Sequence, residues 1–287
     1  MSDFWIILTG CLAAVSCGLL GCFLILRKMA MIGDAISHAV LPGIVIAFLF
    51  SGSLDSVPML VGAATFGIIT TYLIETFNKK GGLQKDASIG ITFTWLFAVG
   101  VILISLYADD VHIDQDCVLF GEIAYVALEP LTSFLPGISA PNTIWVLGIV
   151  MLLIIAMIVV GYKGLFLTTF DPSFAASIGV STVMWHYLLM SAVSVTTVVS
   201  FESVGAILVV ALLIAPAATA YLITDQLPKM LVIAALVGVI SSFGGYYLAV
   251  WLDASVAAAI ATVLGIEFTL VFLFAPRNGV IVKRFKQ

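Results

Sequence analysis

The sequence predicts an all-α, polytopic transmembrane helical bundle of about nine helices. Of the 287 residues, 62% are hydrophobic and only 9% are charged, and the mean hydropathy is +1.24. A water-soluble domain carries about 25% charged residues, so this chain belongs in a bilayer. Long apolar runs recur from end to end, which exceeds what one signal peptide or one anchor would supply. Residues 1–287 are therefore predicted to form a single transmembrane domain.

Each predicted helix is an apolar run close to the length of about 20 residues that crosses the hydrocarbon core of a membrane. The stretch SFESV at 200–204 leaves a second count open, because a broken helix buried there would give eight crossings instead of nine. The runs lie near residues 4–26, 35–52, 57–77, 88–107, 142–162, 183–200, 204–224, 229–251 and 254–275.

The basic residues fall in alternate connections between these runs, and the other connections carry acids. By the positive-inside rule, the basic connections are cytoplasmic. The sequence therefore predicts an N-terminus outside the cell and a C-terminus in the cytoplasm. The basic residues follow the first, third, fifth, seventh and ninth runs: Arg27, Lys28, Lys79, Lys80, Lys85, Lys163, Lys229, Arg277, Lys283, Arg284 and Lys286.

The stretch MIGDAISHAVLPG at 31–43 places ionisable groups in the second run. Asp34 and His38 are four residues apart, which puts both on one helix face, about 6 Å apart along the axis. Ser37 lies close to that face, and Pro42 cannot donate a backbone hydrogen bond to the His38 carbonyl. Carboxylate, imidazole and carbonyl groups are ligands for Mn²⁺, Fe²⁺ and Zn²⁺. These residues therefore form a candidate metal site.

A structural interpretation of this stretch stays open. Asp34 would then only complement the helix dipole, and His38 would only bond to a neighbouring helix. Ionisable groups at membrane depth are costly and commonly functional, so the metal interpretation is favoured.

Glu267, in GIEFTLVF, is a second and weaker candidate for the metal pathway. It lies about 20 Å along a helix that runs inward from residue 254, which places it in the inner half of the membrane. The alternative is a structural ion pair or a hydrogen bond between helices. His186, between Trp185 and Tyr187 at the start of a helix, is interpreted as a residue of the membrane interface.

Two connections are longer than turns: an outer one near 108–141 and an inner one near 163–182. The outer connection has six acids and no Lys or Arg. A field of one sign attracts cations or a basic partner, although a run of charges is commonly only a solvated face.

The sequence lacks several catalytic motifs. It has no G-x-x-x-x-G-K-[ST], no H-E-x-x-H and no G-x-S-x-G. The chain is therefore not predicted to be an enzyme, and any ATP would be hydrolysed by a separate subunit. We predict no covalently bound cofactor and no nucleic-acid partner.

The motif GDAISHAVLPG resembles the most specific motif of the integral-membrane permeases of ATP-binding-cassette importers for manganese, zinc and iron. The form SHAVLPG is more similar to the manganese and iron branch than to the zinc branch. Further similar stretches follow in the same order and cover most of the chain: KDASIGITFTWLFAVGVILIS at 85–105, VLFGE at 118–122, FDPSFAASIGVS at 170–181 and GAILVVALLIAPAATA at 205–220.

The resemblance implies a permease subunit of an ATP-driven importer in a bacterial plasma membrane. It implies that Asp34 and His38 bind the transported ion, most readily Mn²⁺ and otherwise Zn²⁺ or Fe²⁺. Ser37 is a weaker ligand candidate. The implied partners are a second permease subunit, identical or different, a dimer of cytoplasmic ATP-binding subunits, an extracytoplasmic metal-binding protein and membrane lipid.

The inner stretch near 163–182 is the implied coupling segment that receives the motion of the ATPase. Two other classes compete with the importer: a carrier or channel driven by an ion gradient, and a membrane scaffold or enzyme. A carrier needs no docking surface, whereas DPSFAASIGVST is partly apolar and helical in character, which favours the importer. The candidate docking residues are Asp171, Pro172, Ala175, Ala176 and Gly179.

Overall fold

The computed structural model describes residues 2–51, 56–107, 123–135 and 138–275. Helices dominate these residues. A short 3₁₀ helix, η1 (Ile123–Leu128), precedes two antiparallel strands, β1 (Leu131–Leu135) and β2 (Ile138–Pro141). The α-helices are α1 (Ser2–Leu26), α2 (Ile32–Ala39), α3 (Leu41–Ser51), α4 (Ser56–Lys79), α5 (Lys85–Tyr107), α7 (Asn142–Phe170), α8 (Pro172–Ser177), α9 (Thr182–Val204), α10 (Ala206–Ile223), α11 (Leu227–Leu252) and α12 (Val256–Phe274).

Nine segments among the described residues are long and apolar enough to cross a membrane, with α2 and α3 counted together as one. This confirms the predicted helical bundle and favours nine crossings over eight. The stretch SFESV lies within α9, and only Gly205 separates α9 from α10. Gly205 has a φ of 82°, in the left-handed region that glycine adopts without a steric penalty.

The fifth predicted run is too short, because α7 continues to Phe170 instead of ending near 162. The polar residues Tyr162 and Lys163 lower the hydropathy of the sequence there but do not stop the helix. The predicted inner connection at 163–182 therefore begins with helix α7 and continues through α8.

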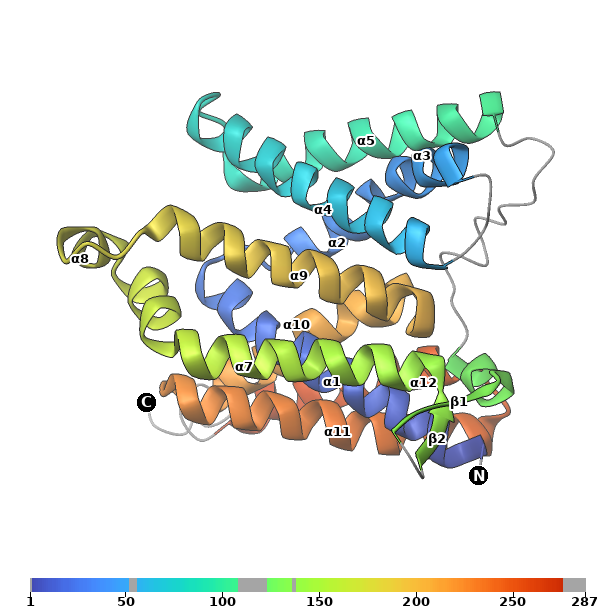
Figure 1. Ribbon diagram of the computed structural model, residues 1–287. Coiled ribbons are helices and arrows are strands. Elements are labelled where there is room, and N and C mark those ends of the chain that lie inside the picture. The colour runs from blue at the N-terminus through green and yellow to red at the C-terminus, as the bar shows by residue number, and fades with distance from the viewer. Residues whose placement is uncertain (1, 52–55, 108–122, 136–137, 276–287) are drawn as a thin grey trace.

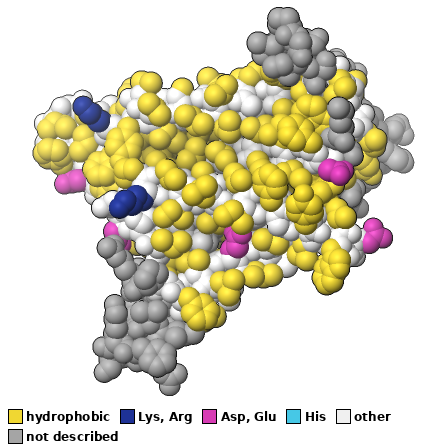
Figure 2. Space-filling model, turned by 90° about the horizontal axis from the view of Figure 1, so that it is seen from below, with side chains coloured by type: hydrophobic (Ala, Val, Ile, Leu, Met, Phe, Trp, Pro, Cys, Tyr) yellow, Lys and Arg dark blue, Asp and Glu magenta, His cyan; other side chains and the backbone are white. Residues whose placement is uncertain are grey.

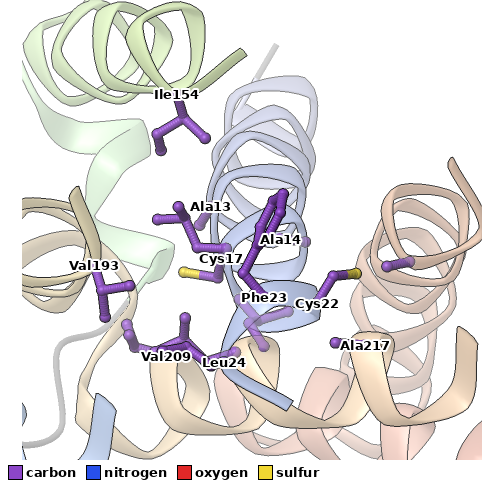
Figure 3. Packing of buried hydrophobic residues seen from close by; sticks show 14 of the residues in the cluster. Ala13, Ala14, Cys17, Cys22, Phe23, Leu24, Ile154, Val193, Val209 and Ala217 are labelled. Atoms are coloured by element: carbon purple, nitrogen blue, oxygen red, sulfur yellow. The ribbon is translucent and has the colours of Figure 1, made fainter. Parts of the chain in front are cut away.

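Helix α1 lies at the centre of the larger helix group and packs against α7, α9, α10 and α11. Small side chains on α1 allow these helices to approach closely. Cys17 and Cys22 are buried there as free thiols and act as small packing residues. Figure 3 shows the cluster, in which Ala13, Ala14, Cys17, Cys22 and Phe23 of α1 lie among Ile154 of α7, Val193 of α9 and Val209 and Ala217 of α10.

Helices α3, α4 and α5 form a second group, at the top of Figure 1. The backbones of α3 and α4 approach closely at Gly43 and Gly62, because a Cβ added to either glycine would meet the backbone carbonyl of the other. Helix α2 lies between the two groups: it packs against α4 and α5 of this group and against α9 and α10. The residues of α2 are therefore placed where the two groups meet.

The connection after α1, with Arg27 and Lys28, and the connection after α4, with Lys80, lie at one end of the bundle, on the left in Figure 1, where α8 is also found. On the face seen in Figure 2, Lys and Arg side chains lie at this same end, and hydrophobic side chains cover the middle. We call this end of the bundle the basic end. Its orientation toward the cytoplasm stays a prediction of the positive-inside rule.

Candidate metal site

Asp34 and His38 lie on α2, which ends at Ala39. The next helix, α3, begins at Leu41 and has Pro42 in its first turn, where a missing backbone N–H is tolerated. The break between the two helices therefore follows from the proline. Because Pro42 has no N–H, the His38 carbonyl lacks the donor that a continuous helix would supply.

The two side chains of the Asp34–His38 pair face each other. His38 Nε2 lies 3.6 Å from Asp34 Oδ1, and each side chain is 33% exposed. Two atoms bound to one ion at about 2.0–2.2 Å lie about 2.8–3.6 Å apart, depending on the angle at the ion. One divalent cation can therefore bind both groups, and water can reach it there.

The His38 ring is positioned by helix α5. Its centroid lies 5.9 Å from that of Phe93 and 5.8 Å from that of Phe97. The two phenylalanine rings restrict the orientation of the imidazole and leave its Nε2 directed toward Asp34.

The two weaker ligand candidates are placed differently. Ser37 is buried beside the pair, but its hydroxyl donates a 2.6 Å hydrogen bond to the backbone carbonyl of Asp34. Glu267 lies on α12, which packs mainly against α10 and α11, and its Oε2 accepts a 2.6 Å hydrogen bond from Ser241 of α11. This matches the alternative interpretation of Glu267 as an interhelical hydrogen-bond acceptor.

Helix α8 follows directly from α7 at the basic end. The Asp171 carboxylate accepts a 2.9 Å hydrogen bond from the Phe174 backbone N–H, and Pro172 occupies the first turn. An acidic cap followed by proline is a favourable helix start. Asp171 and Pro172 therefore shape the predicted coupling segment.

The other candidate docking residues differ in exposure. Ala175 is fully buried against its own chain, whereas Ala176 is exposed. Gly179 has a φ of 82°, and no atom lies within 4 Å of the Cβ that it lacks. The accessible apolar side chains are instead Phe174 and Ile178, 51% and 52% exposed. These two residues are not among the docking residues predicted from the sequence, although large apolar residues in a connection are a usable signal of a docking surface.

Five of the six acids of the outer connection, and the stretch VLFGE, lie outside the described residues. The sixth acid, Glu129, accepts hydrogen bonds from the backbone N–H, at 3.0 Å, and the hydroxyl of Thr143. Thr143 is in the first turn of α7, where a negative charge complements the helix dipole. Glu129 therefore caps α7.

A cavity of about 390 Å³ lies at the basic end. Ile32 of α2 lines it, and Asp34 lies two residues further, about 3 Å along the helix axis. Two residues turn an α-helix by about 200°, so Asp34 lies on the opposite side of α2 from Ile32, and neither Asp34 nor His38 lines the cavity. Its ionisable lining consists of four basic side chains, one carboxylate and one imidazole: Arg27, Lys28, Lys79, Lys85, Glu75 and His186.

Glu75 of α4 and His186 of α9 form a second carboxylate–imidazole pair on this lining. His186 Nε2 lies 3.6 Å from Glu75 Oε2, and the two side chains are 18% and 11% exposed. Both atoms are buried without a hydrogen-bond partner in the structure. The sequence predicts His186 as an interfacial residue only, and Glu75 is not among the predicted site residues.

Two cations flank this Glu75–His186 pair. Lys79 forms an ion pair with Glu75 Oε1, one turn along α4. Arg27 Nη1 lies 3.4 Å from His186 Nδ1, while Arg27 Nε and Nη2 donate hydrogen bonds to Thr169 and Thr168 of α7 at 3.1 and 3.0 Å. Burial lowers the pKa of Arg27 to about 10, which leaves the guanidinium charged at neutral pH.

In the part of the chain that the structure describes, no three His, Cys, Asp or Glu side chains gather into a metal-binding cluster. A metal ion bound by the Asp34–His38 pair would therefore have two side-chain ligands of these types, and backbone oxygens or water would complete its coordination. A low number of protein ligands favours weak binding and release over permanent retention.

Comparisons with known proteins agree over nearly the whole chain. The model of a family described as the ABC 3 transport family matches residues 3–275. The manganese transport system membrane protein MntD of Bacillus subtilis is 49% identical over 284 residues, 99% of this chain and 96% of that protein. The zinc transport system membrane protein TroD of Treponema pallidum is 42% identical over 276 residues, 96% of this chain and 75% of that protein.

A solved structure has the same fold. PsaBC from Streptococcus pneumoniae, in complex with a Fab, superimposes with a TM-score of 0.81 and 30% sequence identity. The match covers 99% of this chain and 94% of that chain.

Proposed function

This chain belongs to the ABC 3 transport family, and we propose that it is the permease subunit of an ATP-driven importer whose cargo is Mn²⁺. It is a multi-pass protein of the bacterial plasma membrane and a transport subunit, not an enzyme. The observation that carries the proposal is the Asp34–His38 pair, with its donor atoms 3.6 Å apart and both side chains partly exposed.

The pair suits a transported ion for three reasons. The Asp34 carboxylate compensates the charge of an ion that loses part of its water shell. Neutral His38 supplies a nitrogen ligand, and its ring is oriented by Phe93 and Phe97. Because α2 lies between the two helix groups, a movement of one group against the other would change the surroundings of an ion bound to α2.

The donor set suits Mn²⁺, Fe²⁺ and Zn²⁺ alike. We favour Mn²⁺ because of the 49% identity to MntD over almost the full length of both chains. Zinc is the second candidate, on the 42% identity to TroD.

We place the basic end in the cytoplasm and propose that α8 docks an ATP-binding subunit there. The exposed Phe174 and Ile178 side chains support this, because apolar side chains of that size are buried when a partner covers them. The complete transporter would contain two permease subunits, identical or different, two ATP-binding subunits and an extracytoplasmic metal-binding protein.

The test is uptake of radiolabelled Mn²⁺ by purified complexes in proteoliposomes that contain the ATP-binding subunits. Asp34→Asn removes the charge but keeps the shape, and we expect it to lower ATP-dependent uptake at least tenfold without changing the subunit composition. Asp253→Asn is the matched control, because Asp253 is exposed at the end of α11 in a left-handed conformation that asparagine tolerates.

Two results would contradict the proposal. Wild-type uptake by Asp34→Asn complexes would exclude the metal role of the pair. Uptake that follows an imposed ion gradient and ignores ATP would instead identify a gradient-driven carrier or channel. Competition by unlabelled Zn²⁺ and Fe²⁺ in the same vesicles ranks the cargo ions.

A further inference from the structure

We propose that Glu75 and His186 form a second, transient metal site that receives the ion from the Asp34–His38 pair, and that Arg27 blocks this site when no ion is present. The inference deepens the proposed function, because it rests on the transport of a divalent cation. It gives the cavity at the basic end the role of an exit chamber.

The donor atoms support a metal site. The Glu75–His186 pair offers one carboxylate oxygen and one imidazole Nε2, 3.6 Å apart, as the Asp34–His38 pair does. A hydrogen bond between nitrogen and oxygen spans about 2.7–3.2 Å, so the 3.6 Å contact is too long for one. Buried polar atoms in proteins are normally hydrogen-bonded, and neither atom has a hydrogen-bond partner here. A cation bound between them would satisfy both.

The position of the pair supports transfer. Glu75, His186 and Ile32 line the same cavity, and Ile32 and Asp34 lie on opposite sides of the first turn of α2. An ion that leaves Asp34 would therefore reach the Glu75–His186 pair by passing around the start of α2. The neighbouring Lys28, Lys79 and Lys85 make the cavity positive, which disfavours long occupancy by a divalent cation and speeds its release.

Arg27 opposes metal binding through the tautomer of His186. A guanidinium group only donates hydrogen bonds, so its contact with Nδ1 favours the tautomer with a lone pair on Nδ1 and hydrogen on Nε2. Metal binding at Nε2 requires the opposite tautomer, in which Nδ1 carries the hydrogen. The Arg27 contact and a metal at Nε2 therefore exclude each other.

The anchors of Arg27 connect this block to the coupling segment. Thr168 and Thr169 accept its hydrogen bonds, and they lie in the last turn of α7, just before Asp171 and α8. Pro172 of α8 lines the same cavity. A displacement of α8 by the ATPase would therefore move the threonines, withdraw Arg27 from His186 and open the site to the ion.

The experiment isolates the second site by removing the first. Complexes carrying Asp34→Asn and His38→Ala, purified with a tag that contains no histidine, are titrated with Mn²⁺ and examined by electron paramagnetic resonance. We expect weak binding while Arg27 is present. Adding Arg27→Gln should lower the dissociation constant for Mn²⁺ at least tenfold, with about one ion bound per permease chain. The bound Mn²⁺ should give a pulsed-resonance signal from an imidazole nitrogen.

That signal should disappear when His186→Gln is added, because His38 is already absent. His112, the remaining histidine of the chain, is present in all these variants, so a loss of the signal in His186→Gln cannot come from His112. A signal that survives His186→Gln, or the absence of Mn²⁺ binding in the assembled Arg27→Gln complex, would overturn the inference.

A transport measurement covers the case in which Arg27→Gln prevents assembly. With Asp34 and His38 intact, Glu75→Gln and His186→Gln should each lower ATP-driven uptake at least tenfold while Mn²⁺ binding to the Asp34–His38 pair is unchanged. Glu202→Gln, an exposed carboxylate on α9, is the matched control. Uptake within twofold of wild type for both variants would exclude the second site and leave the proposed function intact.

Discussion

The Asp34–His38 and Glu75–His186 pairs have the same donor atoms at the same 3.6 Å separation, but their surroundings differ. The first pair lies on one helix, a third exposed, beside two phenylalanine rings. The second joins two helices, is mostly buried and is flanked by cations. A pair on one helix keeps its spacing when helices move, whereas a pair on two helices does not. The first arrangement suits capture of an ion, and the second suits timed release.

The largest expected effect comes from preventing movement between α4 and α9. The Cβ of a residue at position 67 would lie 3.0 Å from the Cβ of Ser194, close to the separation of about 3.5–4.5 Å in a disulfide. Gly67→Cys with Ser194→Cys, in a chain without its native cysteines, should abolish Mn²⁺ uptake when oxidised and regain it on reduction. Binding of Mn²⁺ to the Asp34–His38 pair should persist throughout.

Ser194→Cys alone controls for the added thiol, since it cannot form the crosslink; Gly67→Cys alone is unsuitable, because its Cβ would overlap the Ser194 hydroxyl. Equal uptake by the oxidised and reduced double variant would show that α4 and α9 need not separate, and the distinction between a fixed and an adjustable pair would fail.

A smaller effect is expected when the ligand type of the first pair changes. A thiolate prefers softer ions than an imidazole does, so His38→Cys should favour Zn²⁺ over Mn²⁺. The concentration of Zn²⁺ that halves Mn²⁺ uptake should fall about tenfold. Cys17→Ser, which changes a buried thiol on α1, is expected to leave this concentration unchanged. An unaltered Zn²⁺ sensitivity in His38→Cys would argue that residue 38 does not contact the ion.

The smallest effect concerns the anchors of Arg27. Thr168→Val and Thr169→Val keep the side-chain shape but remove hydrogen-bond acceptors, and a hydrogen bond to a charged group contributes about 1.5–3 kcal/mol. We expect each variant to lower the thermal midpoint of the purified complex by a few degrees and uptake by twofold to fivefold. Thr262→Val, an exposed threonine on α12, is the matched control.

If the threonines only stabilise the fold, uptake per assembled complex will match wild type after correction for the folded fraction. If they hold the block on the Glu75–His186 pair, uptake per assembled complex will change as well.

Much of the fold was predictable because apolar length alone identifies a membrane-spanning helix. The Asp34–His38 pair was also predictable, since residues four apart on one helix share a face whatever surrounds them. The extension of α7 past Lys163 was missed, because hydropathy measures where a helix leaves the membrane and not where it ends.

The Glu75–His186 pair could not be predicted, because it depends on the packing of α4 against α9. Glu75 in the sequence looks like the partner of Lys79 in an ordinary surface pair, and His186 sits between two aromatic residues typical of an interface. The burial of Ala175 beside exposed Ala176 has the same origin, since both are alanines of one short helix and only tertiary contacts distinguish them.

The length of α7 has a mechanical consequence. Its 29 residues span about 44 Å, whereas the hydrocarbon core is about 30 Å thick, so roughly 14 Å of the helix extends beyond the hydrocarbon core if the helix stands upright. Glu129 caps one end of this helix, and α8 follows directly from its other end. If an ATP-binding subunit docks on α8 as we propose, a push on α8 would be transmitted along the whole length of α7 to the end that Glu129 caps.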